Sequence, residues 1–213
     1  MPMNSNNPSI LSIGDTVTLD IGAIAHGGHF VARHEGQVIF VRHAITGETA
    51  KVKITGLSKK LAFGDAIEII NPSKDRVTAP CAFAKPDGCG GCDFQHIDIN
   101  AQRELKAKVI QEQFLRLAKM DIKPEVISVE PQSGLHWRTR INFAISKNGK
   151  PGFYAAKSKT VVEVDQCLLA ADEINSLDIF NRKWRGNDRL NVAVSSLKET
   201  NISRGGRSIS GPT

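Results

Sequence analysis

The sequence predicts a β-rich α+β protein: a five-stranded, OB-like β-barrel followed by an incomplete α+β domain. Three observations support this fold class. Five β-rich stretches alternate with glycine-containing turns within about 60 residues, a pattern typical of a small barrel. A cysteine-containing loop and one helical segment come next, and short β-rich stretches then return. The content of 40% hydrophobic and 23% charged residues excludes a disordered or collagen-like chain.

The predicted barrel occupies residues 13–72 and follows a segment, residues 1–12, that we expect to be disordered. Glycines such as Gly27 and Gly28 accept the backbone angles that tight turns require. We expect Phe30 and Phe40 in the core, because barrel interiors need large apolar side chains. The alternative for either ring is an exposed position where it could stack on a base of RNA. The expected strands are residues 16–24, 29–33, 37–41, 50–57 and 61–70.

The second predicted domain, residues 80–213, opens with a loop and continues into a helix over residues 100–120. Asp98 or Asn100 can cap this helix by accepting from its free first-turn amides. Its apolar positions cover about half of the helix circumference, which suits a helix packed between two bodies. These positions are Leu105, Val109, Ile110, Phe114 and Leu117.

Short elements follow this helix to the end of the sequence. Further strands are expected over residues 126–129, 139–145, 152–154, 161–164 and 191–195, with a second helix over residues 171–181. The last residues, 203–213, have no cap or apolar closure and suggest either a sheet cut short or a basic tail.

The charge is unevenly distributed along the chain. The net charge is +6, but residues 1–80 carry eight Lys and Arg against seven Asp and Glu, so the later part is the basic one. Such an excess fits either a polyanion-binding face or an ordinary solvated surface. No run approaches the roughly 18 apolar residues of a membrane span, so we expect a cytoplasmic monomer without membrane attachment.

The four cysteines suggest an inorganic centre. Cys81, Cys89 and Cys92 form a C-x7-C-x2-C pattern among glycines, and Cys167 stands alone. This pattern fits a 4Fe-4S cluster, a four-cysteine zinc site or unbound buried cysteines. His96 offers a further possibility, a zinc site of three cysteines and one histidine, although it more often would be a histidine without a ligand role.

Two sets of residues resemble known families. The first set comprises Gly14-Asp15, Ala25-His26-Gly27-Gly28, Val31-Ala32-Arg33, Glu35-Gly36, Val38, Phe40-Val41, Gly47-Glu48 and Val52. It resembles a TRAM domain, a small RNA-binding β-barrel. The second set comprises Cys81 to Cys92 with Asp93-Phe94-Gln95-His96, Trp137-Arg138-Thr139-Arg140 and Val164-Asp165-Gln166-Cys167. It resembles the iron-sulfur class of S-adenosylmethionine-dependent RNA uracil-C5 methyltransferases, of the ribosomal RNA type.

The resemblance implies a 4Fe-4S cluster on Cys81, Cys89, Cys92 and Cys167, and structured ribosomal or transfer RNA as partner. In the family, a Rossmann-like domain follows, in which a cysteine attacks C6 of uracil and C5 takes the methyl group. All four cysteines here match cluster positions, and no glycine-rich cofactor turn is present. We therefore expect an N-terminal portion that lacks the catalytic domain and is inactive alone, with helix 100–120 packing on the missing domain.

The candidate RNA-binding residues are basic or aromatic. Arg138 and Arg140 share one face if their segment is extended, which suits paired phosphate contacts. The full candidate set is His26, Arg33, Arg42, Trp137, Arg138 and Arg140. An alternative function for the chain is a stand-alone RNA-binding adapter that holds zinc or an iron-sulfur cluster.

Overall fold

The computed structural model describes residues 11–58, 60–129, 133–185, 189–204 and 207–210, which fall into two compact units. Unit 1 comprises Met1–Thr78 and His96–Val126, and unit 2 comprises Ala79–Gln95 and Ile127–Thr213. The segment His96–Val126 thus groups with the barrel, whereas the sequence placed it in the second domain, residues 80–213. None of the helices in the described residues is long and apolar enough to cross a membrane.

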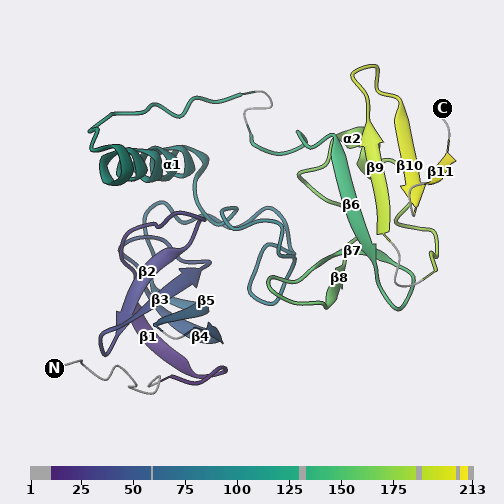
Figure 1. Cartoon of the computed structure of the whole chain (residues 1–213). Helices are drawn as coiled ribbons and strands as arrows, with labels where there is room; N and C mark the ends of the chain where they lie inside the picture. The colour runs from purple at the N-terminus through teal and green to yellow at the C-terminus, as the bar shows by residue number, and fades with distance from the viewer. Residues whose placement is uncertain (1–10, 59, 130–132, 186–188, 205–206, 211–213) are drawn as a thin grey trace. The chain divides into compact units, whose positions relative to one another are not determined.

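The barrel of unit 1 is a five-stranded sheet with the order β1-β4-β5-β3-β2 (Figure 1). Strands β3 and β5 pair in parallel, and the other neighbours are antiparallel. The Gly22 N–H donates to the Val31 carbonyl (2.7 Å), and the Val31 N–H donates to the Ala23 carbonyl (2.9 Å). These bonds join the residues that follow β1 to β2, so the two edge strands of the sheet are connected. The strands are β1 (Thr16–Asp20), β2 (Phe30–His34), β3 (Gln37–Arg42), β4 (Thr49–Leu57) and β5 (Leu61–Asn71).

Alternating side chains fill the interior of the barrel. Phe30, Ile39 and Val41 are almost fully buried, as period-two alternation on a half-buried strand requires. Phe40 is only half-buried, so its predicted core position is wrong, because its neighbours Ile39 and Val41 already point inward. Leu11 is buried as well, so the predicted disordered segment 1–12 does not extend that far, and its residues 1–10 lie outside the described residues.

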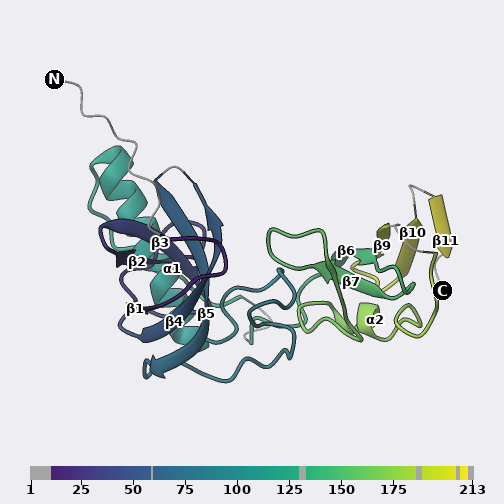
Figure 2. The same cartoon turned by 90° about the horizontal axis from the view of Figure 1, so that it is seen from below.

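The helix of unit 1, α1 (Ile99–Gln113), lies against the barrel in both views (Figures 1 and 2). The Asp98 side chain caps it by accepting from the backbone N–H groups of Asn100 (2.9 Å) and Ala101 (3.3 Å), as predicted. A π-helical turn, η1 (Phe114–Ala118), continues it until Lys119 adopts a left-handed conformation with φ 57°. The predicted helix over residues 100–120 is therefore confirmed to within two residues.

Unit 2 is built on an antiparallel six-stranded sheet with the order β11-β10-β9-β6-β7-β8. One face of the sheet carries a core of Ile141, Phe143, Leu190 and Val192, which packs on residues from the chain between β8 and β9. The elements are β6 (Arg140–Ile145), β7 (Pro151–Tyr154), β8 (Val161–Glu163), α2 (Asp172–Asn175), β9 (Arg189–Val194), β10 (Thr200–Arg204) and β11 (Arg207–Ser210).

Two predicted elements of unit 2 need correction, and the structure decides between the two interpretations of the last segment. Residues 126–129 form no strand: Ile127 and Val129 are 69% and 75% exposed, and no neighbouring strand pairs with them in the described residues. The helix expected over residues 171–181 shortens to α2, because Ile179 and Phe180 reach the core through turns. Of the two interpretations left open for residues 203–213, the described residues bear out a sheet rather than a basic tail, because they belong to β10 and β11, which pair antiparallel. Residues 205–206 and 211–213 lie outside the described part of the chain.

Candidate functional site

Unit 2 brings all four cysteines of the chain to one cavity. Cys81, Cys89 and Cys92 come from the segment Ala79–Gln95, and Cys167 comes from the turn before α2. They line the cavity together with apolar residues that include Phe83, Phe153 and Val164. Because Cys167 is far from the other three in sequence, the fold itself assembles this four-sulfur set.

Glycines let the cysteine loop pack closely against β7. The Gly90 N–H donates to the Tyr154 carbonyl (3.1 Å), and Cys89 forms a β-bridge with Ala155. A Cβ atom on Gly90 would lie 2.8 Å from the Ala156 nitrogen, so a larger residue there would push the loop away. The cysteine loop is thereby held beside residues 154–156, at and just after the end of β7.

The four cysteines are free and half-buried. Burial raises the pKa of the Cys92 thiol to about 11, although a hydrogen bond from Gln95 lowers it in part. Burial also raises the pKa of Cys89, and the charge of Arg138 lowers it in part. Thiols of this kind ionise when a metal cation offsets the cost of burying the thiolate.

The four cysteines suit a metal cluster better than a single metal ion. No three His, Cys, Asp or Glu side chains among the described residues come close enough to hold a single ion. Four cysteine sulfurs are nevertheless the ligand type of iron-sulfur clusters, and a cubane cluster binds its ligands at four separate iron corners. The residues present therefore fit such a group by donor chemistry.

His96 lies in unit 1, and its contacts are with the barrel. Its Nε2 is 3.1 Å from the Ala44 carbonyl oxygen, and the residue is buried. Burial lowers the pKa of His96 to about 4, so the imidazole is neutral at physiological pH. This contact gives His96 a structural role and leaves a zinc site with His96 as fourth ligand without support.

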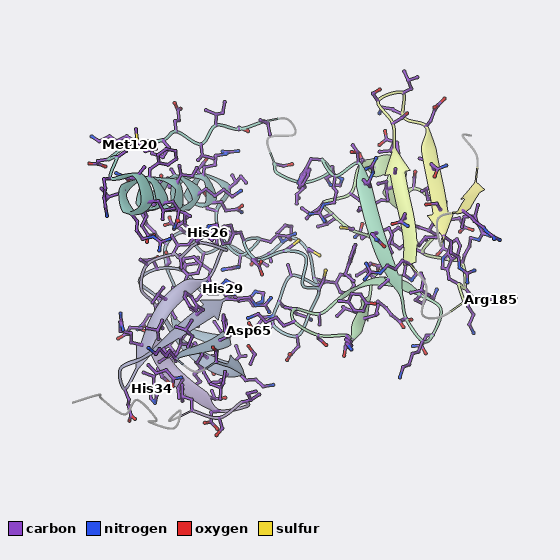
Figure 3. The ribbon with its side chains drawn as sticks, viewed as in Figure 1. His26, His29, His34, Asp65, Met120 and Arg185 are labelled. Atoms are coloured by element: carbon purple, nitrogen blue, oxygen red, sulfur yellow. The ribbon has the colours of Figure 1, made fainter. Side chains whose placement is uncertain are left out.

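Two of the predicted RNA-binding residues line a groove of unit 1. His26 and Arg33 lie there with Phe40 of β3 and with Arg116 of η1. His26 and His29 are at the end of the barrel nearer α1, and His34 is at the far end (Figure 3). The groove thus combines basic side chains with an aromatic ring.

Three aromatic rings form a cluster on the outside of the barrel, and the sequence prediction did not include Phe63 in it. The rings of Phe40 and Phe63 are stacked with centroids 5.8 Å apart, and the His29 ring lies edge-on at 6.1 and 6.2 Å. The parallel pairing of β3 with β5 places Phe40 opposite Phe63. Strict alternation beside Ile39 and Val41 is the signal that could have found the outward position of Phe40.

Arg42 is not among the residues that line the groove of unit 1. Its guanidinium makes a two-point ion pair with Asp65, Nε to Oδ1 and Nη2 to Oδ2 both at 2.9 Å. The two side chains are only 15% and 8% exposed. This ion pair gives Arg42 a structural role, because it links β3 to β5.

The other three predicted RNA-binding residues share a groove of unit 2. Trp137, Arg138 and Arg140 line it together with Asn142 and Phe153. The Arg138 guanidinium lies 5.2 Å from the centre of the Trp137 ring, and Trp137 is half-exposed. Since Phe153 also lines the cysteine cavity, the groove and the cavity are neighbours.

Comparison with known proteins defines the class of unit 1 first. Residues 11–67 match the model of the TRAM domain, so the barrel is a TRAM domain. Over 90% of its length the chain also resembles the solved structure of a tRNA (uracil-54, C5)-methyltransferase from Pyrococcus abyssi, with a TM-score of 0.54 and 17% identity. This likeness is one of fold, and it covers 46% of that chain.

Relatives found by sequence extend the similarity to both units. An uncharacterized RNA methyltransferase of Streptomyces coelicolor is 41% identical over 82% of this chain. The 23S rRNA (uracil(1939)-C(5))-methyltransferase RlmD of Shewanella halifaxensis is 33% identical over 78% of this chain. The chain spans 41% and 38% of the length of these two relatives. These similarities support a relationship to the RNA uracil-C5 methyltransferase family.

Proposed function

We propose that the chain is the RNA-recognition and iron-sulfur portion of an S-adenosylmethionine-dependent RNA uracil-C5 methyltransferase, with ribosomal RNA as substrate. The TRAM barrel supports RNA binding, and the relative named as a 23S rRNA methyltransferase supports the choice of ribosomal RNA over transfer RNA. The observation that carries the proposal is the gathering of all four cysteines around one cavity of unit 2.

Cys81, Cys89, Cys92 and Cys167 would hold a 4Fe-4S cluster in this cavity. The thiolates would each bind one iron, and the apolar walls from Phe83, Phe153 and Val164 would limit access of water. Methyl transfer to uracil needs no electron, so the cluster would stabilise unit 2 and shape the neighbouring groove. The charge of Arg138 near Cys89 would offset part of the negative charge of the thiolates.

RNA would bind at the two grooves that carry the predicted residues. His26 and Arg33 would contact it in unit 1, with Phe40 as a stacking surface. Trp137, Arg138 and Arg140 would contact it in unit 2, where the exposed indole can stack on a base and the guanidinium groups can reach phosphates.

The methyl transfer itself would take place on a domain outside these residues. With all four cysteines of the sequence around one cavity, no thiol is left to attack C6 of uracil. Exposed apolar side chains near the end of α1 and in η1 support a contact with that domain, and they are Ile110, Phe114, Leu115 and Leu117. The chain alone should leave uridine unmethylated, and 5-methyluridine formed by these 213 residues would contradict this assignment.

The salt dependence of RNA binding tests the groove of unit 2. Replacement of Arg140 by Ala should lower the affinity for a ribosomal RNA fragment several-fold and reduce the salt slope by about one phosphate contact. Lys108 is an exposed residue of α1 outside both grooves, so Lys108→Ala serves as the control. Fluorescence anisotropy at several salt concentrations measures both quantities. Equal effects of the two substitutions would contradict the proposed RNA contact.

A further inference from the structure

The Gln95 side chain bridges two of the cysteines. Its Oε1 accepts a hydrogen bond from the Cys81 backbone N–H (3.1 Å), and its Nε2 donates one to the Cys92 sulfur (3.2 Å). The residue closes the segment Ala79–Gln95 and lines the same cavity as the sulfurs. One carboxamide thus fixes the backbone at one predicted ligand and touches the sulfur atom of another.

A second carboxamide fixes the cysteine that comes from a distant part of the chain. The Cys167 N–H donates to Asn175 Oδ1 (3.0 Å), and Asn175 Nδ2 donates to the Cys167 carbonyl (3.0 Å). The same Nδ2 lies 3.4 Å from the Ala170 carbonyl. Asn175, the last residue of α2, therefore orients the Cys167 backbone from both sides, and these hydrogen bonds are with backbone atoms rather than with the sulfur.

The two contacts differ in electrostatics. An amide N–H directed at a sulfur ligand places positive charge beside it and stabilises the more negative state of the centre. Hydrogen bonds to ligand sulfurs are among the features that set the reduction potential of an iron-sulfur cluster. A carboxamide that binds only backbone atoms fixes geometry without this direct effect on the sulfur.

We propose that Gln95 and Asn175 are positioning residues of the four-cysteine site, and that Gln95 also raises the reduction potential of the bound cluster through its hydrogen bond to the Cys92 sulfur. This inference rests on the proposed 4Fe-4S cluster. Gln95 and Asn175 contact cysteines from the two separate segments, so together they pre-organise the cavity before any metal enters. Neither residue takes part in methyl transfer.

Substitutions at Gln95 separate the electrostatic role from the structural one. Gln95→Glu keeps an acceptor for the Cys81 N–H but removes the donor to the sulfur, so the reduction potential should become more negative. Gln95→Met keeps a similar volume without either hydrogen bond and should shift the potential in the same direction. Asn175→Ala should leave the potential near the wild-type value and speed the loss of iron to a chelator.

Gln166→Ala is the matched control, because Gln166 is also a glutamine that lines the cavity and adjoins a cysteine. Among the described residues its side chain makes no hydrogen bond to a cysteine. Redox titration of the anaerobically purified chain, followed by electron paramagnetic resonance, measures the potential. Time-resolved bleaching with an iron chelator measures the loss of iron.

The outcomes distinguish this inference from the proposed cluster. A more negative potential in both Gln95 variants, with Gln166→Ala unchanged, supports it. Iron-loaded Gln95 variants with the wild-type potential would overturn the inference and leave the cluster assignment intact. Wild-type protein that holds one zinc and no iron would overturn both.

Discussion

Glu48 illustrates how single residues stabilise unit 1. Its carboxylate is fully buried and accepts from Arg76 Nε (2.6 Å) and Nη2 (2.7 Å) and from the backbone N–H groups of Ile45 (2.9 Å) and Ser73 (3.0 Å). Burial alone would raise the pKa of Glu48, but Arg76 and the backbone N–H groups lower it below its usual value. Arg76 also donates to the His43 carbonyl (2.9 Å), so the chain that leaves β5 is tied back to the barrel.

Arg76→Ala should lower the free energy of unfolding by about 3 to 5 kcal/mol, because the Glu48 charge would remain buried without its partner. The exposed pair of Lys51 and Glu68, with a distance of 2.9 Å, provides the control. Lys51→Ala should cost less than about 1 kcal/mol. Urea titration followed by circular dichroism measures both variants, and similar losses in the two would contradict the role of the buried pair.

Site residues could be predicted where their role restricts the residue type, and not where it depends on contacts made by the fold. The four cysteines stood out from spacing alone, because ligand chemistry restricts the residue type. The structural role of Arg42 was not predicted, since a sequence shows a positive charge but not the Asp65 carboxylate that pairs with it across two strands. Gln95 and Asn175 were missed because their hydrogen bonds depend on loop conformation, which no local pattern encodes.

At the scale of elements, α1 carries two kinds of apolar side chain. Ala101 and Leu105 are buried, whereas Ile110 is exposed, and in the π-helical turn η1 that continues the helix Phe114 is exposed and Leu117 is 72% exposed. The wide apolar face expected from the sequence is therefore present, and the described residues of unit 1 cover only part of it.

Substitutions of buried and of exposed leucines in α1 and η1 should differ in their effect on the free energy of unfolding. Leu105→Ala should cost about 2 to 5 kcal/mol of stability, because it leaves a cavity in a packed site. Leu117→Ser should change stability by less than about 0.5 kcal/mol and should reduce self-association and binding of an apolar dye. Urea titration and analytical ultracentrifugation provide the measurements. A large loss of stability in Leu117→Ser would show that this side chain is already packed within the chain.

Elements defined by local signals were predicted well, and those defined by distant partners were not. The five barrel strands agree with the alternation and glycine turns of the sequence, although β1 ends four residues early. Residues 126–129 have a similar apolar content but no partner strand, and a strand needs a neighbour for its backbone hydrogen bonds. The pair of β10 and β11 was expected only as a sheet region without defined strands, because its polar residues give little alternation.

At the scale of the whole molecule, the chain passes from unit 1 to unit 2 and returns before it completes unit 2. A domain predicted from sequence is one continuous stretch of chain. For this reason α1 was predicted to belong to the second domain, although it belongs to unit 1. Contacts between residues far apart in sequence decide such boundaries, and a single sequence does not display them.

The buried His96 makes the stability of the molecule dependent on pH. The folded state holds the imidazole neutral down to about pH 4, whereas the unfolded chain takes up a proton near pH 6.5. Stability is therefore fully present above pH 6.5 and falls as the pH drops from 6.5 to 4. The expected loss between pH 7 and pH 5 is about 2 kcal/mol.

His96→Gln should flatten this dependence, because the amide can still donate to the Ala44 carbonyl but does not titrate. His26→Gln, at an exposed histidine, serves as the control. Urea titrations at pH 7, 6 and 5 measure the slopes. A wild-type slope that persists in His96→Gln would assign the pH dependence to other groups.

The most direct test of the proposed 4Fe-4S cluster is metal analysis of the anaerobically purified chain, combined with its visible spectrum. A 4Fe-4S cluster on the four cysteines predicts a brown protein with about four irons and four sulfides per chain. Both should be lost when Cys167 is changed to Ser, because this cysteine completes the cavity. A colourless protein with one zinc, or a Cys167→Ser variant that keeps its full iron content, would contradict it.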